Sequence, residues 1–200
     1  GCAVVAACDT NAERARAFAA LHGIPHAFDN LDAALAWGGF EAVVNATPDQ
    51  VHKPTTLQVL EHGKAVFCEK PLAVHAADAF EMVAAAEAAG VVNMVNLTYR
   101  NAHAIQMARR MIEAGEIGDI RHVAASYLQS WLTARHWGDW RTDERWLWRL
   151  STAHGSGGVL GDIGIHILDF VTFGTGLDVA ALGARLKTFD KAEGGAIGDY

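Results

Sequence analysis

The sequence has 200 residues, 51% of them hydrophobic, and a formal net charge of −7. This length and apolar content are enough for a packed core and exclude a disordered chain. The negative charge and the absence of lysine or arginine runs argue against nucleic acid or an anionic membrane as the main partner, so we expect a small molecule or another protein.

The cysteines and the apolar runs predict a cytoplasmic protein without a membrane segment. Cys2, Cys8 and Cys68 are odd in number and lack the C-x-x-C spacing of zinc or redox sites, which favours reduced thiols. No stretch reaches the roughly 18 apolar residues of a membrane span, and the opening residues GCAVVAACDT lack the basic leader of a signal peptide.

The first half of the sequence alternates short apolar runs with helical patterns, which is typical of β-α units around a parallel sheet. The runs are mostly apolar on both faces, as the strands of a doubly covered sheet must be. We expect strands over residues 3–8, 24–28, 42–46, 65–68 and 91–97.

Capping residues mark helices between these strands. Thr10 and Glu13 match the capping-box pattern and so predict a helix to about residue 21. Asp49 can cap a helix that ends near residue 61. An alanine-rich helix over 75–89 should end at Gly90, because glycine is a usual helix stop.

The alternation of short apolar runs with helical patterns ends after residue 97, so we place a domain boundary at about 97–101. A tryptophan-rich stretch and a glycine-rich turn stand out in the second half. The expected elements there are a helix over 102–114, a strand over 120–131, a helix over 161–173 and a strand over 179–189.

Asp9 closes the first expected strand. In a dinucleotide-binding sheet an acid at a strand end hydrogen-bonds the adenosine ribose, although such a residue can instead cap the following helix. The glycine loop that should stand upstream is missing, because no G-x-G-x-x-G occurs in the sequence. The glycines of HGSGGVLG at 154–161 do not directly follow an apolar strand, so we do not interpret them as a phosphate loop.

Glu69, Lys70 and Pro71 follow a buried run at the carboxyl edge of the expected sheet, where open α/β sheets bind ligands. The proline favours an extended conformation at Lys70 and makes a cis peptide possible. Beside an oxidised nicotinamide, positive charge and partial burial would tune this lysine to polarise or deprotonate a hydroxyl. The plainer alternative is a surface salt bridge between Glu69 and Lys70.

Asp162 and His166 are four residues apart on an expected helix and should share one face. An imidazole that can take a proton, beside a carboxylate that fixes its tautomer, is suited to alcohol oxidation. A purely structural pair, or two ligands of a metal, are alternatives. The sequence offers no obvious third and fourth ligand, so we expect no metal. Asp169, three residues further on, is interpreted as a helix-surface acid.

Tryptophans and arginines gather between residues 131 and 149, with Trp140 and Arg141 among them. Flat aromatic rings suit the C–H faces of sugars, and arginine suits carboxylates, which favours a sugar acid or glycoside as the ligand. The alternative is a loop that packs on its own domain or on a second subunit.

Five segments, taken together and in this order, resemble the Gfo/Idh/MocA family, the glucose-fructose oxidoreductase and inositol dehydrogenase group. They are CD at 8–9, NATPDQVH at 45–52, EKPLA at 69–73, NLTYRN at 96–101 and GSGGVLGDIGIHILD at 155–169. The resemblance implies an α/β fold with two domains. Residues 1–98 would form an NAD(P)-binding Rossmann domain with a parallel sheet that lacks its first strand and glycine loop, and 99–200 an α+β domain with an open, mostly antiparallel sheet.

The resemblance also implies a site. His166 would be the catalytic base, Asp162 its partner and Lys70 the group that orients the hydroxyl. The cofactor would lie against Asp9, Ala46, Thr47, Pro48, His52, Glu69, Lys70, Pro71 and Asn96. The substrate would contact Lys70, Tyr99, Arg100, Trp140, Arg141, Asp162 and His166. An acid at Asp9 would repel a 2′-phosphate, which favours NAD over NADP.

These features predict an NAD(P)-dependent oxidoreductase that transfers a hydride between nicotinamide and a hydroxyl of a sugar, polyol or cyclitol. An NAD-dependent glycosidase of the same fold and a non-catalytic sugar- or protein-binding regulator are the alternatives. The resemblance implies a homo-oligomer, either a dimer or a tetramer. The missing first strand and the early end of the second sheet indicate an internal piece of a longer protein.

Overall fold

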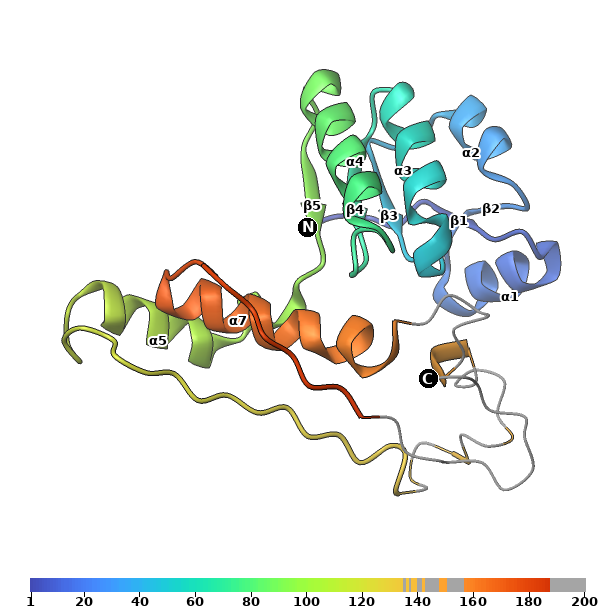
Figure 1. Ribbon diagram of the computed structural model, residues 1–200. Coiled ribbons are helices and arrows are strands. Elements are labelled where there is room, and N and C mark those ends of the chain that lie inside the picture. The colour runs from blue at the N-terminus through green and yellow to red at the C-terminus, as the bar shows by residue number, and fades with distance from the viewer. Residues whose placement is uncertain (135, 137, 140–141, 143–147, 151–156, 188–200) are drawn as a thin grey trace. The chain divides into compact units, whose positions relative to one another are not determined.

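The computed structural model describes residues 1–134, 136, 138–139, 142, 148–150 and 157–187 (Figure 1). The chain divides into two compact units, Gly1–Asn96 and Leu97–Tyr200. Each unit is built around its own contacts and is described by itself. No described helix is both long enough and apolar enough to cross a membrane.

The first unit contains five short parallel strands. They are β1 (Ala6–Cys8), β2 (His26–Phe28), β3 (Ala42–Asn45), β4 (Ala65–Cys68) and β5 (Asn93–Val95). The strands form two ladders, β1–β2 and β3–β4–β5, in place of the single sheet expected from the sequence. Every pairing is parallel, so the α/β fold with parallel strands is confirmed. In a doubly wound sheet the first strand joins the two halves, and none of the described strands lies between β1 and β3.

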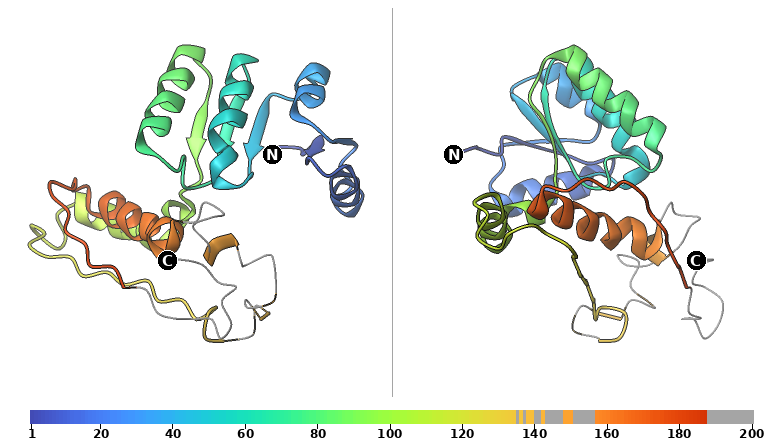
Figure 2. Two further views of the ribbon diagram at one scale, coloured as in Figure 1. Left: turned by 45° about the vertical axis from the view of Figure 1, so that its right-hand side comes forward. Right: turned by 60° about the vertical axis from the view of Figure 1, so that its left-hand side comes forward.

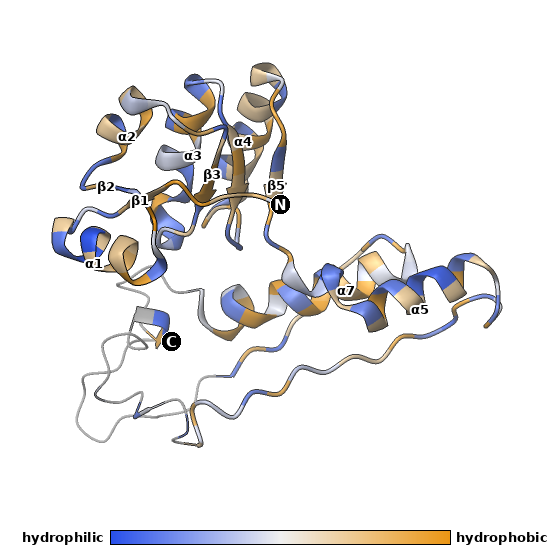
Figure 3. Cartoon of the chain, turned by 180° about the vertical axis from the view of Figure 1, so that it is seen from behind, coloured by the Kyte–Doolittle hydropathy of each residue, from blue (hydrophilic) through white to orange (hydrophobic). Residues whose placement is uncertain are grey.

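Helices connect consecutive strands of this unit. They are α1 (Ala12–His22), α2 (Leu31–Trp37), α3 (His52–Glu61), which follows a 3₁₀ turn at Asp49–Val51, and α4 (Ala76–Ala89). Helices α3 and α4 pack on one face of the β3–β4–β5 ladder, as the turned views in Figure 2 show. The core between them contains Leu35, Val59, Leu60, Val66 and Ala86. Strands β3 and β4 of this ladder are accordingly coloured mainly as hydrophobic in Figure 3.

Three helix expectations change in the structure. Asp49 does not cap α3, because it lies inside the preceding 3₁₀ turn and no side chain caps that helix. The cap of α1 is Asn11 and not Thr10, because Asn11 has extended backbone angles and its side chain accepts the N–H groups of Glu13 and Arg14, each at 3.0 Å. Helix α2 was not expected, because seven residues are too few to show a helical period. The predicted stop at Gly90 is confirmed, since this glycine has a left-handed φ of 63°.

The second unit is helical over most of its described elements. They are a 3₁₀ turn at Thr98–Asn101, α5 (His103–Glu113), a 3₁₀ turn at Trp148–Leu150, a π-helical segment at Leu160–Gly164 and α7 (Ile165–Thr175). Helices α5 and α7 approach closely, because a Cβ at Gly174 would stand 2.7 Å from the Ile105 side chain.

The strands expected over 120–131 and 179–189 are not found among the described residues of the second unit. Residues 120–130 and 179–187 form irregular chain without an assigned ladder, and 188–189 lie outside the described residues. A strand is defined by hydrogen bonds to a neighbouring strand, and alternating apolar residues predict the strand without supplying that neighbour. The expected antiparallel sheet is therefore not present in this part of the structure.

Candidate active site

The carboxyl ends of β3, β4 and β5 bring together most of the expected cofactor residues. The ladders align Asn45 with Cys68, and Cys68 with Val95, so all three strands end at the same edge. Two further backbone bonds extend the pairing, from Glu69 N–H to the Asn45 carbonyl at 2.9 Å and from Asn96 N–H to the Cys68 carbonyl at 2.7 Å. The residues that follow this edge are Ala46, Thr47, Pro48, Glu69, Lys70, Pro71 and Asn96.

Asn45 organises the loop after β3, although it was not among the expected site residues. Its side chain is 3% exposed, and its Oδ1 accepts the Thr47 hydroxyl at 2.7 Å. Its Nδ2 donates to the hydroxyl oxygens of Thr55 at 2.6 Å and Thr56 at 3.0 Å on α3. An asparagine that closes an apolar strand is the sequence signal that could have identified it, because a buried amide needs hydrogen-bond partners.

His52 connects two loops at this edge from inside the protein. The residue is 0% exposed, with Nδ1 lying 2.7 Å from the Pro71 carbonyl oxygen and Nε2 lying 2.8 Å from that of Thr47. His52 was expected to line a cofactor, and the structure places its ring wholly inside the protein, between these two loops. A wholly buried ring acts on a ligand through the loops that it holds.

The Glu69-Lys70-Pro71 segment is fixed at its backbone. Glu69 Oε2 accepts the N–H of Lys70 at 3.2 Å, and Glu69 Oε1 accepts a hydrogen bond from the Asn96 side chain. The Lys70–Pro71 peptide bond is cis, and Lys70 itself is half-buried. Burial is the main cause that raises the pKa of the neighbouring Cys68 thiol to about 11, so this thiol is not suited to act as a nucleophile.

Asp9 closes β1, as expected. Its Oδ1 accepts the N–H of Asn11 at 2.8 Å, and its Oδ2 lies 3.3 Å from Arg14 Nη1. The Arg14 side chain is 70% exposed, so this ion pair lies at the surface and is weak. Asp9 therefore holds the start of the α1 turn and keeps a carboxylate at the carboxyl end of a parallel strand.

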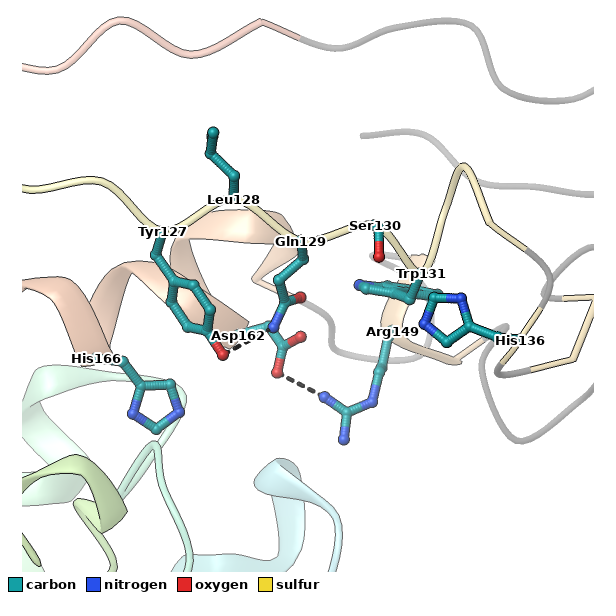
Figure 4. A pocket seen from close by; sticks show the side chains of 9 residues that line it. All are labelled: Tyr127, Leu128, Gln129, Ser130, Trp131, His136, Arg149, Asp162 and His166. Carbon is teal, nitrogen blue, oxygen red and sulfur yellow. Dashed lines mark hydrogen bonds and ion pairs between the residues drawn. The ribbon is translucent and has the colours of Figure 1, made fainter. Parts of the chain in front are cut away.

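In the second unit, Asp162 and His166 line one cavity of about 480 Å³ (Figure 4). Asp162 lies in the π-helical segment and His166 in the first turn of α7. The two side chains line the same cavity although they belong to helical segments of different type. Such π-helical turns are frequent at functional sites. The other lining residues are Tyr127, Leu128, Gln129, Ser130, Trp131, His136 and Arg149.

Two polar contacts order the wall of this cavity (Figure 4). Arg149 Nη1 lies 2.5 Å from Asp162 Oδ1, with the two side chains 32% and 23% exposed. Gln129 Nε2 donates to the Tyr127 hydroxyl oxygen at 3.0 Å. Arg149 lay in the tryptophan-rich stretch noted in the sequence, whereas no sequence pattern pointed to Tyr127.

The rings of two tyrosines, Tyr99 and Tyr127, lie beside His166. The ring of Tyr99 meets it edge to face, with centroids 4.6 Å apart and an interplanar angle of 83°. The hydroxyl groups of Tyr99 and Tyr127 are hydrogen-bonded. This hydrogen bond is the largest cause that raises the pKa of Tyr99 to about 12, so Tyr99 stays neutral at physiological pH.

Arg100 and Asp169 form an ion pair that was not expected. Arg100 Nε lies 2.9 and 3.0 Å from the two carboxylate oxygens, and its Nη2 lies 2.5 Å from Oδ1. Asp169 is 8% exposed, which corrects the interpretation of this residue as a helix-surface acid. The guanidinium expected to meet substrate is thus bound to α7, three residues after His166.

Two expected substrate residues, Trp140 and Arg141, lie outside the described residues. Among the residues that the structure does describe, no group of three or more His, Cys, Asp or Glu side chains is placed to hold a metal ion.

Comparison with known proteins matches both halves of the chain to one family. A family described as "Oxidoreductase family, NAD-binding Rossmann fold" matches residues 1–97, and the "GFO/IDH/MocA C-terminal domain" matches residues 105–199.

Named relatives are similar across most of the chain. A 1,5-anhydro-D-fructose reductase of Ensifer adhaerens is 36% identical over 85% of this chain and 48% of its own length. The scyllo-inositol 2-dehydrogenase (NADP(+)) IolU of Bacillus subtilis is 33% identical over 95% of this chain and 56% of its own. An inositol dehydrogenase homolog from Azotobacter vinelandii, solved with NAD+, is 29% identical with a TM-score of 0.74, covering 82% of this chain and 44% of that one. The chain thus spans about half the length of the relatives it matches.

Proposed function

Because the chain belongs to the Gfo/Idh/MocA oxidoreductase family, we propose that the protein is an NAD-dependent dehydrogenase acting on a hydroxyl of a sugar, polyol or cyclitol. The observation that carries the proposal is that Asp162 and His166 line one cavity, on a chain whose other unit presents Lys70 at the carboxyl edge of a parallel ladder. The named relatives act on substrates of this kind.

The first unit, with its boundary proposed at residue 98, would hold the cofactor. Thr47, Glu69 and Asn96 offer hydroxyl, carboxylate and amide groups at one edge, which suits the ribose-rich body of a dinucleotide. The Asp9 carboxylate at the end of β1 would accept hydrogen bonds from the adenosine ribose and would repel a 2′-phosphate. NAD is therefore proposed over NADP. When bound, the nicotinamide supplies the hydride acceptor.

The second unit would hold the substrate and take its proton. As the C–H hydride leaves, the hydroxyl proton passes to the His166 imidazole and the carbon becomes a carbonyl. Asp162 fixes the imidazole or the substrate hydroxyl, and Arg149 holds that carboxylate at 2.5 Å. The family resemblance implies that Lys70 of the first unit orients and polarises a substrate hydroxyl. Asn96, Tyr99 and Arg100 complete the proposed site, with Arg100 acting through Asp169.

The cavity favours a polyhydroxyl ligand. Trp131 offers an aromatic surface for C–H groups, while Gln129 and His136 offer hydrogen-bonding groups. The carbohydrate-like partner is inferred from this lining and from the names of the relatives. A cytoplasmic homo-oligomer is proposed from the family resemblance and from the three free cysteines.

The test is hydride transfer by the full-length protein with NAD or NADP and a panel of sugars, polyols and cyclitols. His166→Ala and Lys70→Met should lower kcat about 10²- to 10⁴-fold while NAD binding is retained. His103→Ala at the start of α5 and Lys64→Met at the start of β4 are the matched controls and should leave kcat unchanged. Absence of NADH formation with every substrate, or equal loss in the controls, contradicts the proposal. Release of sugar from a glycoside without net NADH would assign the glycosidase reaction instead.

A further inference from the structure

We propose that His52 is a positioning residue that joins the loops after β3 and β4 and so holds the backbone at Lys70. The functional meaning of this role rests on the proposed function of Lys70. The joining of the two loops does not, because it can be measured without substrate or cofactor.

The geometry of the His52 ring is unusual in one respect. Both of its nitrogens face carbonyl oxygens, that of Pro71 at 2.7 Å and that of Thr47 at 2.8 Å, and the residue is 0% exposed. A carbonyl oxygen only accepts, so each contact requires an N–H on the ring. A neutral imidazole has one N–H and can donate to one carbonyl at a time. Joining both loops at once therefore requires an N–H on each ring nitrogen.

Hydrogen bonds at both ring nitrogens also satisfy the polar atoms of a wholly buried side chain, which would be costly to leave without partners. The surrounding elements also carry charges of both signs. On the 3₁₀ turn, the first turn of α3, the loop after β4 and the first turns of α4 these are Asp49, Lys53, Glu69, Lys70, Asp78 and Glu81. Lys53 is itself paired with Asp78 at 2.7 Å and with Glu81 at 2.6 Å.

The consequence for Lys70 follows from the bonds on either side of it. Its own N–H is held by the Glu69 carboxylate at 3.2 Å, and the carbonyl of the next residue, Pro71, is held by His52. The loop after β3 is fixed in the same way, because the Thr47 hydroxyl donates to Asn45 and the Thr47 carbonyl oxygen lies in hydrogen-bond distance of the His52 ring. One buried ring thus couples the positions of both loops.

Hydrogen exchange measured by mass spectrometry tests the coupling on the full-length protein without ligands. His52→Phe keeps a flat ring and removes both donors, so amides in residues 46–49 and 69–73 should exchange about tenfold faster or more, and together. Val59→Ala is the control, because Val59 lies on the same helix and is 1% exposed in the core. In that variant, exchange in both loops should speed up only as much as exchange in the protein as a whole. Unchanged exchange in either loop of His52→Phe overturns the coupling.

A second measurement reads the ring itself. Nitrogen-15 NMR of the His52 side chain at neutral pH should show protons on both ring nitrogens, and a single N–H overturns the two-loop arrangement. If His52→Phe does not fold, His52→Gln provides the exchange test. Its amide can donate to one carbonyl, so faster exchange is expected in one loop only, and no change in either loop contradicts the proposal.

Kinetics then separate this role from the proposed function. His52→Phe should lower kcat about 10- to 100-fold with KM nearly unchanged, because a displaced Lys70 lowers the rate more than it weakens binding. If the wild-type protein transfers no hydride but the exchange pattern is found, the proposed function falls and the coupling stands. If hydride transfer is found and both loops are unaffected by His52→Phe, the coupling falls and the function stands.

Discussion

Replacing Arg100 by methionine measures how firmly the helix that carries His166 is held. The change removes three N–H contacts from the Asp169 carboxylate, which is 8% exposed. A hydrogen bond to a charged group contributes about 1.5–3 kcal/mol, and breaking an ion pair costs more when the remaining charge stays buried. The Arg100 side chain is 45% exposed, so solvent offsets part of the loss, and we expect a destabilisation of about 2–3 kcal/mol.

Arg109→Met is the matched control for this prediction. Both arginines lie over the Phe173 ring, with Cζ 4.5 Å from the centroid for Arg109 and 5.1 Å for Arg100. The ion-pair partner of Arg109 is Glu113, whose side chain is 58% exposed. An exposed pair and a cation–π contact each contribute about 0.5 kcal/mol, so we expect a loss of about 1 kcal/mol.

Urea unfolding followed by tryptophan fluorescence is the assay, because five of the six tryptophans belong to Leu97–Tyr200. The double variant Arg100→Met with Asp169→Leu should recover about 1–2 kcal/mol of the summed single losses, since it removes the orphaned charge as well as its partner. Equal losses for Arg100→Met and Arg109→Met would refute the reasoning, because they would assign the stabilisation to the Phe173 contact. Strict additivity in the double variant would refute it too.

Three further predictions concern the first unit. Asn11→Ala should lower the free energy of unfolding by about 1 kcal/mol, whereas Thr10→Ala should change it by less than about 0.5 kcal/mol, because Asn11 caps α1. Denaturation curves of the two variants check this, and a larger loss for Thr10→Ala would reinstate the capping box. At about pH 8, iodoacetamide should modify exposed Cys2 well before Cys68, since a pKa of about 11 in place of 9.0 lowers the Cys68 thiolate fraction about 100-fold. Peptide mass spectrometry gives the order, with equal rates counting against the burial of Cys68. The same raised pKa contributes stability that is present below pH 9 and lost as the pH rises toward 11, so Cys68→Ala should show a shallower alkaline decline.

The sequence predicts the parts of the site that local chemistry encodes. Apolar runs that end in Asn45 and Cys68 place the following loops at one edge, because parallel strands point the same way. The Glu69-Lys70-Pro71 run marks a shaped loop, since proline restricts its neighbour. The four-residue spacing of Asp162 and His166 predicts that both lie on one face of a helix, and in the structure both line one cavity.

Contacts between distant segments account for what the sequence does not predict. Tyr127 meets Tyr99 across 28 positions, and Arg100 meets Asp169 across 69. Neither contact leaves a periodic pattern. Burial is equally hard to foresee for His52, because a histidine that directly follows a turn is compatible with a surface or an interior position. The expected strands over 120–131 and 179–189 depend in the same way on partner strands.

The division of the first unit into two ladders has a consequence for its behaviour in solution. Among the described strands, β1 pairs only with β2, and β3 pairs only with β4, so each ladder ends in an edge strand. Such an edge presents backbone N–H and C=O groups at regular intervals and can template a further strand about 4.8 Å away. Val44 on β3 is 67% exposed and adds an apolar side chain to that surface. Residues 1–96 produced alone should accordingly self-associate as their concentration rises, through strand addition and not through the core.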